Sequence, residues 1–301
     1  MITPNCRFCT AVPSLQSIKG RFVYGGTSEQ HFWRCDACRI IYLFPPISDE
    51  EESVFYKKEF ETYMERRTGQ DKDWSSPERH FLSNQREVRR RMPFLESYLT
   101  KAQEILEIGC SSGFMLSALK DRGMDVYGLD PSEGFIEYVR SKGIQVKKTL
   151  EELKENHDTA FDLILHYYVL EHIRNPLAFI SQYMELLNDT GKMIFEVPCA
   201  TDPLIELYKV PAFDRFYWSV AHHWYFNRES LAALLKKTGY GFELFPDQRY
   251  DISNHMTWMQ EGKPGGLGRY SHIFGSELDR LYKEKLKDNW LCDTIIAVVK
   301  K

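Results

Sequence analysis

The stretch Glu104-Ile-Leu-Glu107-Ile-Gly109-Cys-Ser-Ser-Gly113 decides the fold of this 301-residue chain. Its apolar residues predict a short buried parallel strand, and its two glycines predict a tight turn that brings the backbone close to a ligand. A helix is expected over residues 114–122, ended by a glycine. A second strand over residues 125–130 then ends on the carboxylate of Asp130. Strand, glycine turn, helix, strand and acid in this order predict a nucleoside-binding α/β site.

The spacing within the turn argues against a dinucleotide. Ser111 and Phe114 stand where the second and third glycines of G-x-G-x-x-G would be, and Glu107 would repel a pyrophosphate. The pattern E-x-G-x-x-x-G with a following acid resembles the class I S-adenosylmethionine-dependent methyltransferases. In that family Glu107 and the turn would hold the methionine end of the cofactor, and Asp130 would accept both ribose hydroxyls. A nicotinamide-binding Rossmann domain and a purely structural glycine turn remain as alternatives.

The downstream chain adds to this resemblance over roughly residues 99–301. Residues 161–166 predict a fourth strand, and Val169-Leu-Glu-His172 before Pro176 is similar to the family's signature after that strand. A helix over 177–187, a turn over 188–191, a strand over 192–197, a helix over 228–238 and a last strand over 293–300 are expected. The resemblance assigns the following residues to the cofactor site: Glu107, Gly109, Cys110, Ser111, Gly113, Phe114, Asp130, Pro131, His166 and Tyr168.

Four of the seven cysteines form two pairs near the N-terminus, Cys6-x-x-Cys9 and Cys35-x-x-Cys38. Two such turns present four thiolates to one point, which predicts a tetrahedral Zn²⁺ site in a ribbon over residues 1–46. Closed four-sulfur coordination implies a structural metal. A region this short buries little core, so metal ligation would contribute most of its stability. A thiol redox pair or unpaired buried cysteines are the alternatives.

Composition excludes some classes of function. The net charge of −4 gives no general attraction to nucleic acid or to anionic membranes. We expect no membrane-spanning helix, because no apolar run approaches about 18 residues. The first residues carry no visible signal peptide, so a cytoplasmic location is expected.

Between the ribbon and the Rossmann-like part, residues 47–98 predict a polar helical linker. In related enzymes such a segment covers the cofactor, and a tyrosine such as Tyr63 could then approach the methyl donor. The recurrence of Tyr56, Phe60, Tyr63 and Met64 also fits ordinary core packing on one helix face. A cluster of arginines at 86, 89, 90 and 91 is expected on a solvated helix face paired with Glu87 and Glu96, and phosphate binding is the alternative.

Two insertions, residues 200–226 and 246–290, are expected to form a substrate lid, because ligands of such sheets bind beyond the carboxyl ends of the strands. The stretch His222-His-Trp-Tyr-Phe226 resembles the motif H-E-H-x-x-Y-F of sugar C-methyltransferases, whose second histidine is the proposed base. His222 matches that position, whereas Ala221 replaces the glutamate, which favours O- over C-methylation. The catalytic candidates are His222, His223 and Tyr225. The substrate-binding candidates are Tyr63, His172, Trp224, Asn254 and His255.

The ribbon followed by this α/β domain resembles bacterial sugar methyltransferases of antibiotic-sugar and surface-polysaccharide pathways. The resemblance implies a Rossmann-like sheet with a zinc ribbon and lid insertions. It also implies methyl transfer from S-adenosylmethionine to a hydroxyl of a sugar or nucleotide sugar. A sugar C-methyltransferase, an RNA or protein methyltransferase that uses the ribbon for binding, and a non-catalytic assembly subunit stay open.

Overall fold

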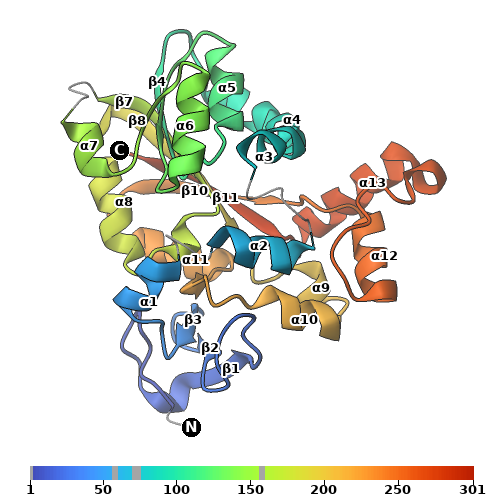
Figure 1. Ribbon diagram of the computed structural model, residues 1–301. Helices are drawn as coiled ribbons and strands as arrows, with labels where there is room; N and C mark the ends of the chain where they lie inside the picture. Colours follow the sequence, from blue (N-terminus) through green and yellow to red (C-terminus); the bar gives the residue numbers. More distant parts are fainter. Residues whose placement is uncertain (1–2, 56–59, 70–75, 156–159) are drawn as a thin grey trace. The chain divides into compact units, whose positions relative to one another are not determined.

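The computed structural model describes residues 3–55, 60–69, 76–155 and 160–301 (Figure 1). It contains a seven-stranded sheet in the order β10-β11-β8-β7-β4-β5-β6 and a four-stranded sheet in the order β1-β2-β3-β9. Helices and strands alternate along the larger sheet, so the α/β prediction is confirmed. The strands of this sheet are β4 (Glu104–Ile108), β5 (Asp125–Leu129), β6 (Gln145–Lys147), β7 (Phe161–Tyr167), β8 (Leu187–Pro198), β10 (Gly241–Asp247) and β11 (Thr294–Lys300).

The chain enters the larger sheet at β4, in its interior. It continues outward through β5 to β6 and then returns to pair β7 on the other side of β4. Strand β4 is parallel to both β5 and β7, and β5 is parallel to β6. Strand order therefore reverses between β4 and β7, and the carboxyl ends at such a switch point are where doubly wound sheets bind ligands.

The chain divides into two compact units. The first unit comprises Met1–Ile47, Leu170–Ala178 and Glu196–Ala297, and the second comprises Ser48–Val169, Phe179–Phe195 and Val298–Lys301. In the second unit, α4 packs against α5 and α3 packs against α6. The helices that lie wholly in the second unit are α1 (Asp49–Val54), α2 (Phe60–Thr68), α3 (Pro77–Ser83), α4 (Gln85–Leu95), η3 (Glu96–Tyr98), α5 (Phe114–Lys120), α6 (Glu133–Ser141) and α7 (Leu150–Lys154). Helix α8 (Pro176–Met184) begins in the first unit and continues in the second.

The four-stranded sheet lies in the first unit and joins two segments that are far apart in the sequence. Strands β1 (Gln16–Gly20), β2 (His31–Cys35) and β3 (Ile41–Phe44) pair in antiparallel fashion, and β9 (Trp224–Tyr225) adds to the free edge of β3. Residue Ile41 pairs with Tyr225 in this register. The first insertion therefore completes the ribbon sheet, a pairing that the sequence did not predict.

Aromatic side chains form the core under this sheet. The ring of Phe32 lies 5.4 Å from that of Trp218 and 4.9 Å from that of Tyr225, measured between centroids. All three side chains are almost completely buried. Gly20 is required here, because a Cβ at this position would lie 2.5 Å from the Trp218 indole. The other helices of this unit are η1 (Pro13–Leu15), η4 (Leu170–His172), α9 (Pro203–Glu206), α10 (Pro211–Tyr217), α11 (Arg228–Lys236), α12 (Ile252–Glu261) and α13 (Ser271–Asp288).

The turn predicted over residues 188–191 was wrong, because β8 already begins at Leu187 and runs through these residues. The side-chain amide of Asn188 donates to a carboxylate oxygen of Asp162 on β7. The same Asn188 accepts the backbone N–H of Thr190 at 3.0 Å. The bond to Asp162 ties this Asn-Asp-Thr-Gly sequence to β7 within the sheet, although the bond from Thr190 has the i to i+2 form of an Asx turn. The other predicted helices and strands agree with the structure to within a few residues.

Candidate functional site

The turn after β4 has a backbone that glycine alone adopts easily. Gly109 and Gly113 have φ angles of 68° and 69°, and Ser111 between them has a φ angle of 47°. A Cβ on Gly109 would lie 2.7 Å from Cγ2 of Val169, and one on Gly113 would lie 2.9 Å from Val139. Both glycines are therefore fixed by left-handed backbone and by close packing. The turn leads into α5, as the sequence predicted.

Asp130 follows the last residue of β5 and closes this turn. Its Oδ2 accepts the backbone N–H of Ser111 at 2.7 Å, and its Oδ1 accepts that of Ser132 at 2.9 Å. The side chain is 7% exposed. Because each carboxylate oxygen accepts more than one hydrogen bond, Asp130 can still accept from the hydroxyls of a ligand.

Glu107 is the second acid of this site and lies on the neighbouring strand, β4. It is 2% exposed, and no described residue donates a hydrogen bond to its Oε2. Burial raises the pKa of Glu107 to about 8; the positive charge of Arg91 opposes this shift and the negative charge of Asp130 adds to it. A cationic ligand group at Oε2 would stabilise the ionised carboxylate.

The expectation that all four arginines of this helix face solvent was wrong for Arg91. Its side chain is buried, and its guanidinium carbon lies 3.8 Å from the ring centroid of Tyr167, a cation–π contact. Arg86 and Arg89 are exposed as expected. The predicted pairing with Glu87 is also observed, since Arg90 Nε donates to its carboxylate at 2.9 Å. Arg91 differs because its guanidinium carbon also lies 5.8 Å from the ring centroid of Phe114 on α5, against which α4 packs.

His80 on α3 is a residue of this region that the sequence did not reveal. Its Nδ1 lies 2.9 Å from the hydroxyl oxygen of Ser112 in the turn, and its ring centroid lies 5.1 Å from that of Phe135. Burial lowers the pKa of His80 to about 4, so the ring is neutral near pH 7. A single histidine in a polar helix carries no sequence signal for such a contact.

The remaining cofactor candidates lie in different surroundings. Cys110 is buried, with its Sγ against Gly128, and Phe114 is buried at the start of α5, whereas Pro131 is exposed. His166 is completely buried and stacks on Phe195 at 4.5 Å, and burial lowers the pKa of this imidazole to about 3. Tyr168 has a φ angle of 58°, a strained value for a tyrosine.

The predicted linker residues lie partly outside the described residues. Tyr56 falls in the gap at 56–59, and nothing is described of the side chain of Phe60. Tyr63 on α2 is half-buried, and its ring packs edge-on against Phe55 with centroids 5.2 Å apart.

The four N-terminal cysteines converge in the first unit. The Sγ atoms of Cys6, Cys9, Cys35 and Cys38 all lie within 4.8 Å of one another, and none of the four forms a disulfide. Cys6 and Cys38 are 3.7 Å apart at sulfur, as are Cys9 and Cys35. Tetrahedral zinc with Zn–S bonds of about 2.3 Å separates its sulfurs by about 3.8 Å. The backbone N–H groups of Phe8 and Cys9 also point at Cys6 Sγ, at 3.4 and 3.5 Å. The donor set therefore fits zinc.

A second cluster in the first unit brings together Glu171, His172 and His222. One ligand atom from each lies within 4.8 Å of the others. The rings of His172 and His222 meet edge to face with centroids 4.6 Å apart. Nδ1 of His172 lies 2.9 Å from the carbonyl oxygen of Ala221, which fixes the orientation of this imidazole. The structure thus joins one predicted catalytic residue and one predicted substrate-binding residue.

Glu171 is the member of this cluster that the sequence analysis did not select. It is 1% exposed, and no other described residue donates a hydrogen bond to either carboxylate oxygen. Burial raises the pKa of Glu171 to about 8, and the backbone N–H of Glu171 itself and the positive charge of Arg249 oppose the shift. Its place in the Val169-Leu-Glu-His172 signature was the only available signal.

His223, Trp224 and Tyr225 are held in the ribbon sheet. The backbone N–H of His223 donates to the Glu171 carbonyl at 2.8 Å, and its own carbonyl accepts from Leu43 at 3.0 Å. Trp224 Nε1 donates to the Ile173 carbonyl at 2.8 Å. The Tyr225 hydroxyl accepts the backbone N–H of Ser219 at 3.1 Å and donates to the Tyr217 carbonyl. These contacts fix the loop that carries His222.

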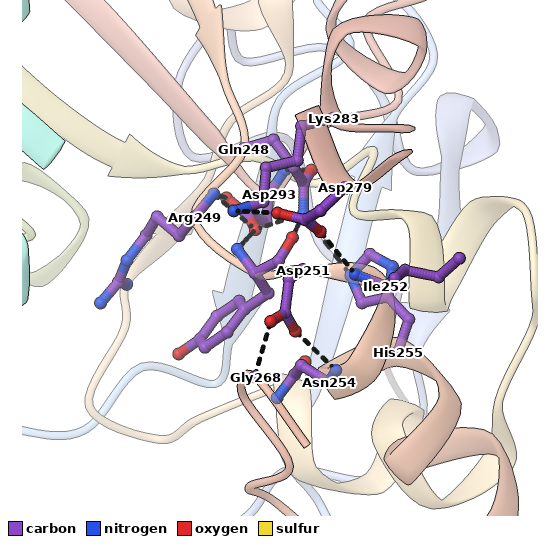
Figure 2. Close-up of polar contacts among 11 residues, drawn as sticks. Gln248, Arg249, Asp251, Ile252, Asn254, His255, Gly268, Asp279, Lys283 and Asp293 are labelled. Atoms are coloured by element: carbon purple, nitrogen blue, oxygen red, sulfur yellow. Dashed lines mark hydrogen bonds and ion pairs between the residues drawn. The ribbon is translucent and has the colours of Figure 1, made fainter. Parts of the chain in front are cut away.

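Figure 2 shows the polar network of the second insertion, where Asn254 and His255 lie. Asp293 accepts hydrogen bonds from Gln248 Nε2 at 2.7 Å and from the Arg249 backbone at 3.0 Å. Asp251 caps α12 by accepting from the Asn254 backbone at 2.8 Å. Asn254 Nδ2 donates to the Gly265 carbonyl at 2.7 Å, and His255 Nδ1 hydrogen-bonds Tyr282. Both candidates therefore make contacts that hold the insertion together.

Comparison with known proteins identifies the fold. An S-adenosylmethionine-dependent methyltransferase of Archaeoglobus fulgidus superimposes with a TM-score of 0.50 at 19% identity, over 74% of this chain and 99% of that one. Among curated relatives, a ubiquinone biosynthesis O-methyltransferase of Coxiella burnetii is 28% identical over 112 residues, 35% of this chain and 48% of the relative. One of Dinoroseobacter shibae is 31% identical over 103 residues, 31% of this chain and 40% of the relative. The chain spans about half the length of these curated relatives or less.

In the part of the chain that the structure describes, no helix combines the length and the apolar character needed to cross a bilayer. The family model of a methyltransferase domain matches residues 79–243, more than half of the chain, and this range contains β4, the glycine turn and Asp130. The chain therefore belongs to the methyltransferase-domain family and has its Rossmann-like α/β fold.

Proposed function

We propose that this protein transfers the methyl group of S-adenosylmethionine to a hydroxyl of a small molecule. The observation that carries the proposal is the pair of buried acids, Glu107 and Asp130, at the carboxyl ends of adjacent strands beside the switch point. Glu107 would pair with the cofactor's ammonium, and Asp130 would accept its ribose hydroxyls. The left-handed turn between them leaves room for the ligand against the backbone.

In this reaction an acceptor oxygen attacks the methyl carbon in line with the sulfur. A C–O bond forms, the C–S bond breaks, and its electron pair stays on sulfur as S-adenosylhomocysteine. The cofactor supplies the activated methyl group, so the protein must position the acceptor and remove its proton. His222, beside His172 and Glu171, is the residue to which we assign that task.

The acceptor that we propose first is a hydroxyl of a sugar or nucleotide sugar. The support is the four-cysteine ribbon that precedes this domain and the partial match of residues 222–226 with the sugar-methyltransferase motif. The replacement of the motif's glutamate by Ala221 favours oxygen over carbon as the acceptor. A precursor in ubiquinone biosynthesis is the second candidate, because the curated relatives carry that name.

The four cysteines Cys6, Cys9, Cys35 and Cys38 would hold one structural Zn²⁺. Their sulfur spacing and their free thiols support this assignment. Four-sulfur coordination leaves no position for a substrate, so the ion would stabilise the ribbon and take no part in methyl transfer. A cytoplasmic location is part of this proposal, since free thiolates persist in a reducing compartment.

The first test is label transfer from methyl-tritiated S-adenosylmethionine to nucleotide sugars, ubiquinone precursors and total RNA in parallel. Label in a nucleotide sugar supports the proposal in its full form, and label in a ubiquinone precursor selects the second acceptor. Label in RNA would overturn the small-molecule assignment. Bound cofactor with label in none of the three would indicate a more elaborate acceptor, such as a lipid-linked or polymeric glycan, and failure to bind cofactor would revive a non-catalytic role.

Variants test the assignment of His222. The change His222→Ala should leave cofactor affinity unchanged and lower turnover by about 10²-fold or more, the usual contribution of a positioned proton acceptor. His272→Gln on α13, at an exposed position, is the matched control and should keep both quantities. An unchanged turnover in His222→Ala would remove this residue from the reaction.

A further inference from the structure

The cluster of Glu171, His172 and His222 has the composition of a metal site separate from the four cysteines. The three residues come from two segments, the η4 turn after β7 and the loop before β9. Their ligand atoms lie within 4.8 Å of one another, close enough for one ion to reach all three. Glu171 and His222 are 1% and 7% exposed, so the cluster is largely shielded from bulk water.

The orientation of His172 is the one found in metal-ligating histidines. Its Nδ1 lies 2.9 Å from the Ala221 carbonyl oxygen. A carbonyl oxygen only accepts, so Nδ1 carries the hydrogen of the neutral ring and Nε2 carries the lone pair. A ligating histidine usually donates its other N–H to a carbonyl or a carboxylate in this way. The same loop that provides His222 therefore also prepares His172 as a ligand.

The buried carboxylate of Glu171 is a second, independent indication of a bound cation. Both carboxylate oxygens are inaccessible to water and receive no hydrogen bond from another described residue. The backbone carbonyl of Glu171 accepts the N–H of His223 at 2.8 Å, which ties Glu171 to the loop that carries His222 and His223. A buried carboxylate without donors is unfavourable, and a bound cation offsets that cost. Arg249 supplies positive charge to the surroundings of Glu171, whereas an ion among the three ligands would contact its oxygens directly.

We propose that Glu171, His172 and His222 bind a divalent transition-metal ion such as Mn²⁺, Co²⁺ or Zn²⁺. Two imidazoles and one carboxylate suit such ions, whereas the four-cysteine site selects a softer, thiophilic metal. Three protein ligands leave coordination positions open for another molecule. The ion would lower the pKa of a water or hydroxyl group bound at such a position. Where the ion is bound, His222 serves as its ligand and does not itself take up a proton.

The test is binding of Mn²⁺ alone to the purified, zinc-loaded full chain, without cofactor or acceptor. The electron paramagnetic resonance signal of free Mn²⁺ falls as the ion binds, and four thiolates compete poorly for this hard ion. We expect one site per chain. Glu171→Gln and His172→Gln should each weaken binding by at least about 10-fold. Glu171→Asp, which keeps the carboxylate, should retain part of the affinity, and His272→Gln should retain all of it.

A second measurement keeps the test decisive if a glutamine variant fails to fold. Co²⁺ added to the unaltered protein should give weak visible absorption of nitrogen and oxygen ligands, without the intense thiolate bands of a cysteine site. Absence of Mn²⁺ and Co²⁺ binding, or binding that all folded variants retain, overturns the inference.

Failure of the metal-site proposal and failure of the methyl-transfer proposal would give different results. Metal binding by protein that does not bind S-adenosylmethionine would keep the metal site and remove the methyl-transfer assignment. Label transfer by protein that binds neither Mn²⁺ nor Co²⁺ would keep the enzyme and remove the metal, and His222 would then act alone on the acceptor proton.

Discussion

Asp130 accepts the backbone N–H of Ser111 at 2.7 Å, so the acid after β5 is bonded directly to the glycine turn after β4. The bond joins the two features of the sequence from which the nucleoside site was predicted. It also keeps the carboxylate in place beside a residue whose φ angle of 47° is unusual for serine. The acid and the turn are therefore one structural feature, and a change in either should affect the other.

Replacing Asp130 by alanine should abolish cofactor binding. The change removes the acceptor for two ribose hydroxyls and frees the N–H groups of Ser111 and Ser132. Hydrogen bonds to a charged group contribute about 1.5–3 kcal/mol each, so affinity should fall by at least about 10²-fold. Titration calorimetry with S-adenosylhomocysteine measures this. Asp125→Asn at the exposed start of β5 is the control, and near-normal affinity in Asp130→Ala would refute our placement of the ribose.

Gly109→Ala should destabilise the protein by about 2–4 kcal/mol and weaken cofactor binding. The new Cβ would lie 2.7 Å from Val169 Cγ2 in left-handed backbone, and strain and crowding each cost about 1–3 kcal/mol. Gly123→Ala separates the two costs, because Gly123 has a φ angle of 83° with nothing within 4 Å of the added Cβ. Urea unfolding of both variants is the measurement. Equal losses would show that contact with Val169 contributes nothing.

Stability should fall as pH rises from about 5 to 8, and Glu107 should cause part of that fall. Its pKa is about 8 in the folded protein against an ordinary value of 4.5, so the folded state holds a proton that the unfolded state has lost. Between these values each pH unit costs at most about 1.4 kcal/mol for one such group. The contribution of Glu107 to stability is therefore complete below pH 4.5 and lost above pH 8.

The change Glu107→Gln tests this without altering the shape of the side chain. The variant should show a flatter dependence of unfolding free energy on pH than the parent, measured in urea at several values between pH 5 and 8. Parallel curves would mean that Glu107 already carries its charge in the folded protein. Adding S-adenosylmethionine should stabilise the parent more at pH 8 than at pH 6, since its ammonium would pair with the ionised carboxylate.

The larger sheet and the glycine turn were predictable because both follow from local patterns. Apolar runs mark buried strands, and the positive φ angles of Gly109 and Gly113 restrict those positions to residues without a Cβ. The one wrong element, the turn at 188–191, failed because Asn188 bonds across to Asp162 of β7. Local turn propensity carries no information about such a partner in a distant segment.

The candidate site was only partly predictable for the same reason. His222 could be selected from a motif, but its neighbours Glu171 and His172 precede it by about 50 residues. The addition of β9 to the ribbon sheet likewise joins residues 41 and 225. Arg91 and His80 lie in a polar helical stretch where burial follows only from packing against α5 and α6.

The four-cysteine ribbon should require zinc for its stability. Loss of zinc should also disturb the loop that carries His222 and His223. Strand β3 follows Cys38 along the chain and pairs with strand β9, and β9 directly follows His222 and His223. Without the metal, the small sheet keeps only its aromatic core, and most of the stability of such a region comes from ligation. Disorder in β3 would remove the Leu43 bond that holds the His223 carbonyl.

The change Cys38→Ser should therefore lower the bound zinc, measured by mass spectrometry, by one ion per chain, and it should reduce the melting temperature and turnover. Cofactor affinity should persist, because the glycine turn and Asp130 belong to the other compact unit. Cys38→His keeps a zinc ligand and should restore most of the metal, while Cys292→Ala changes a buried cysteine outside the cluster and should leave zinc unchanged. If instead oxidants formed disulfides among the four cysteines of zinc-free protein without loss of stability, the ribbon would be a redox element.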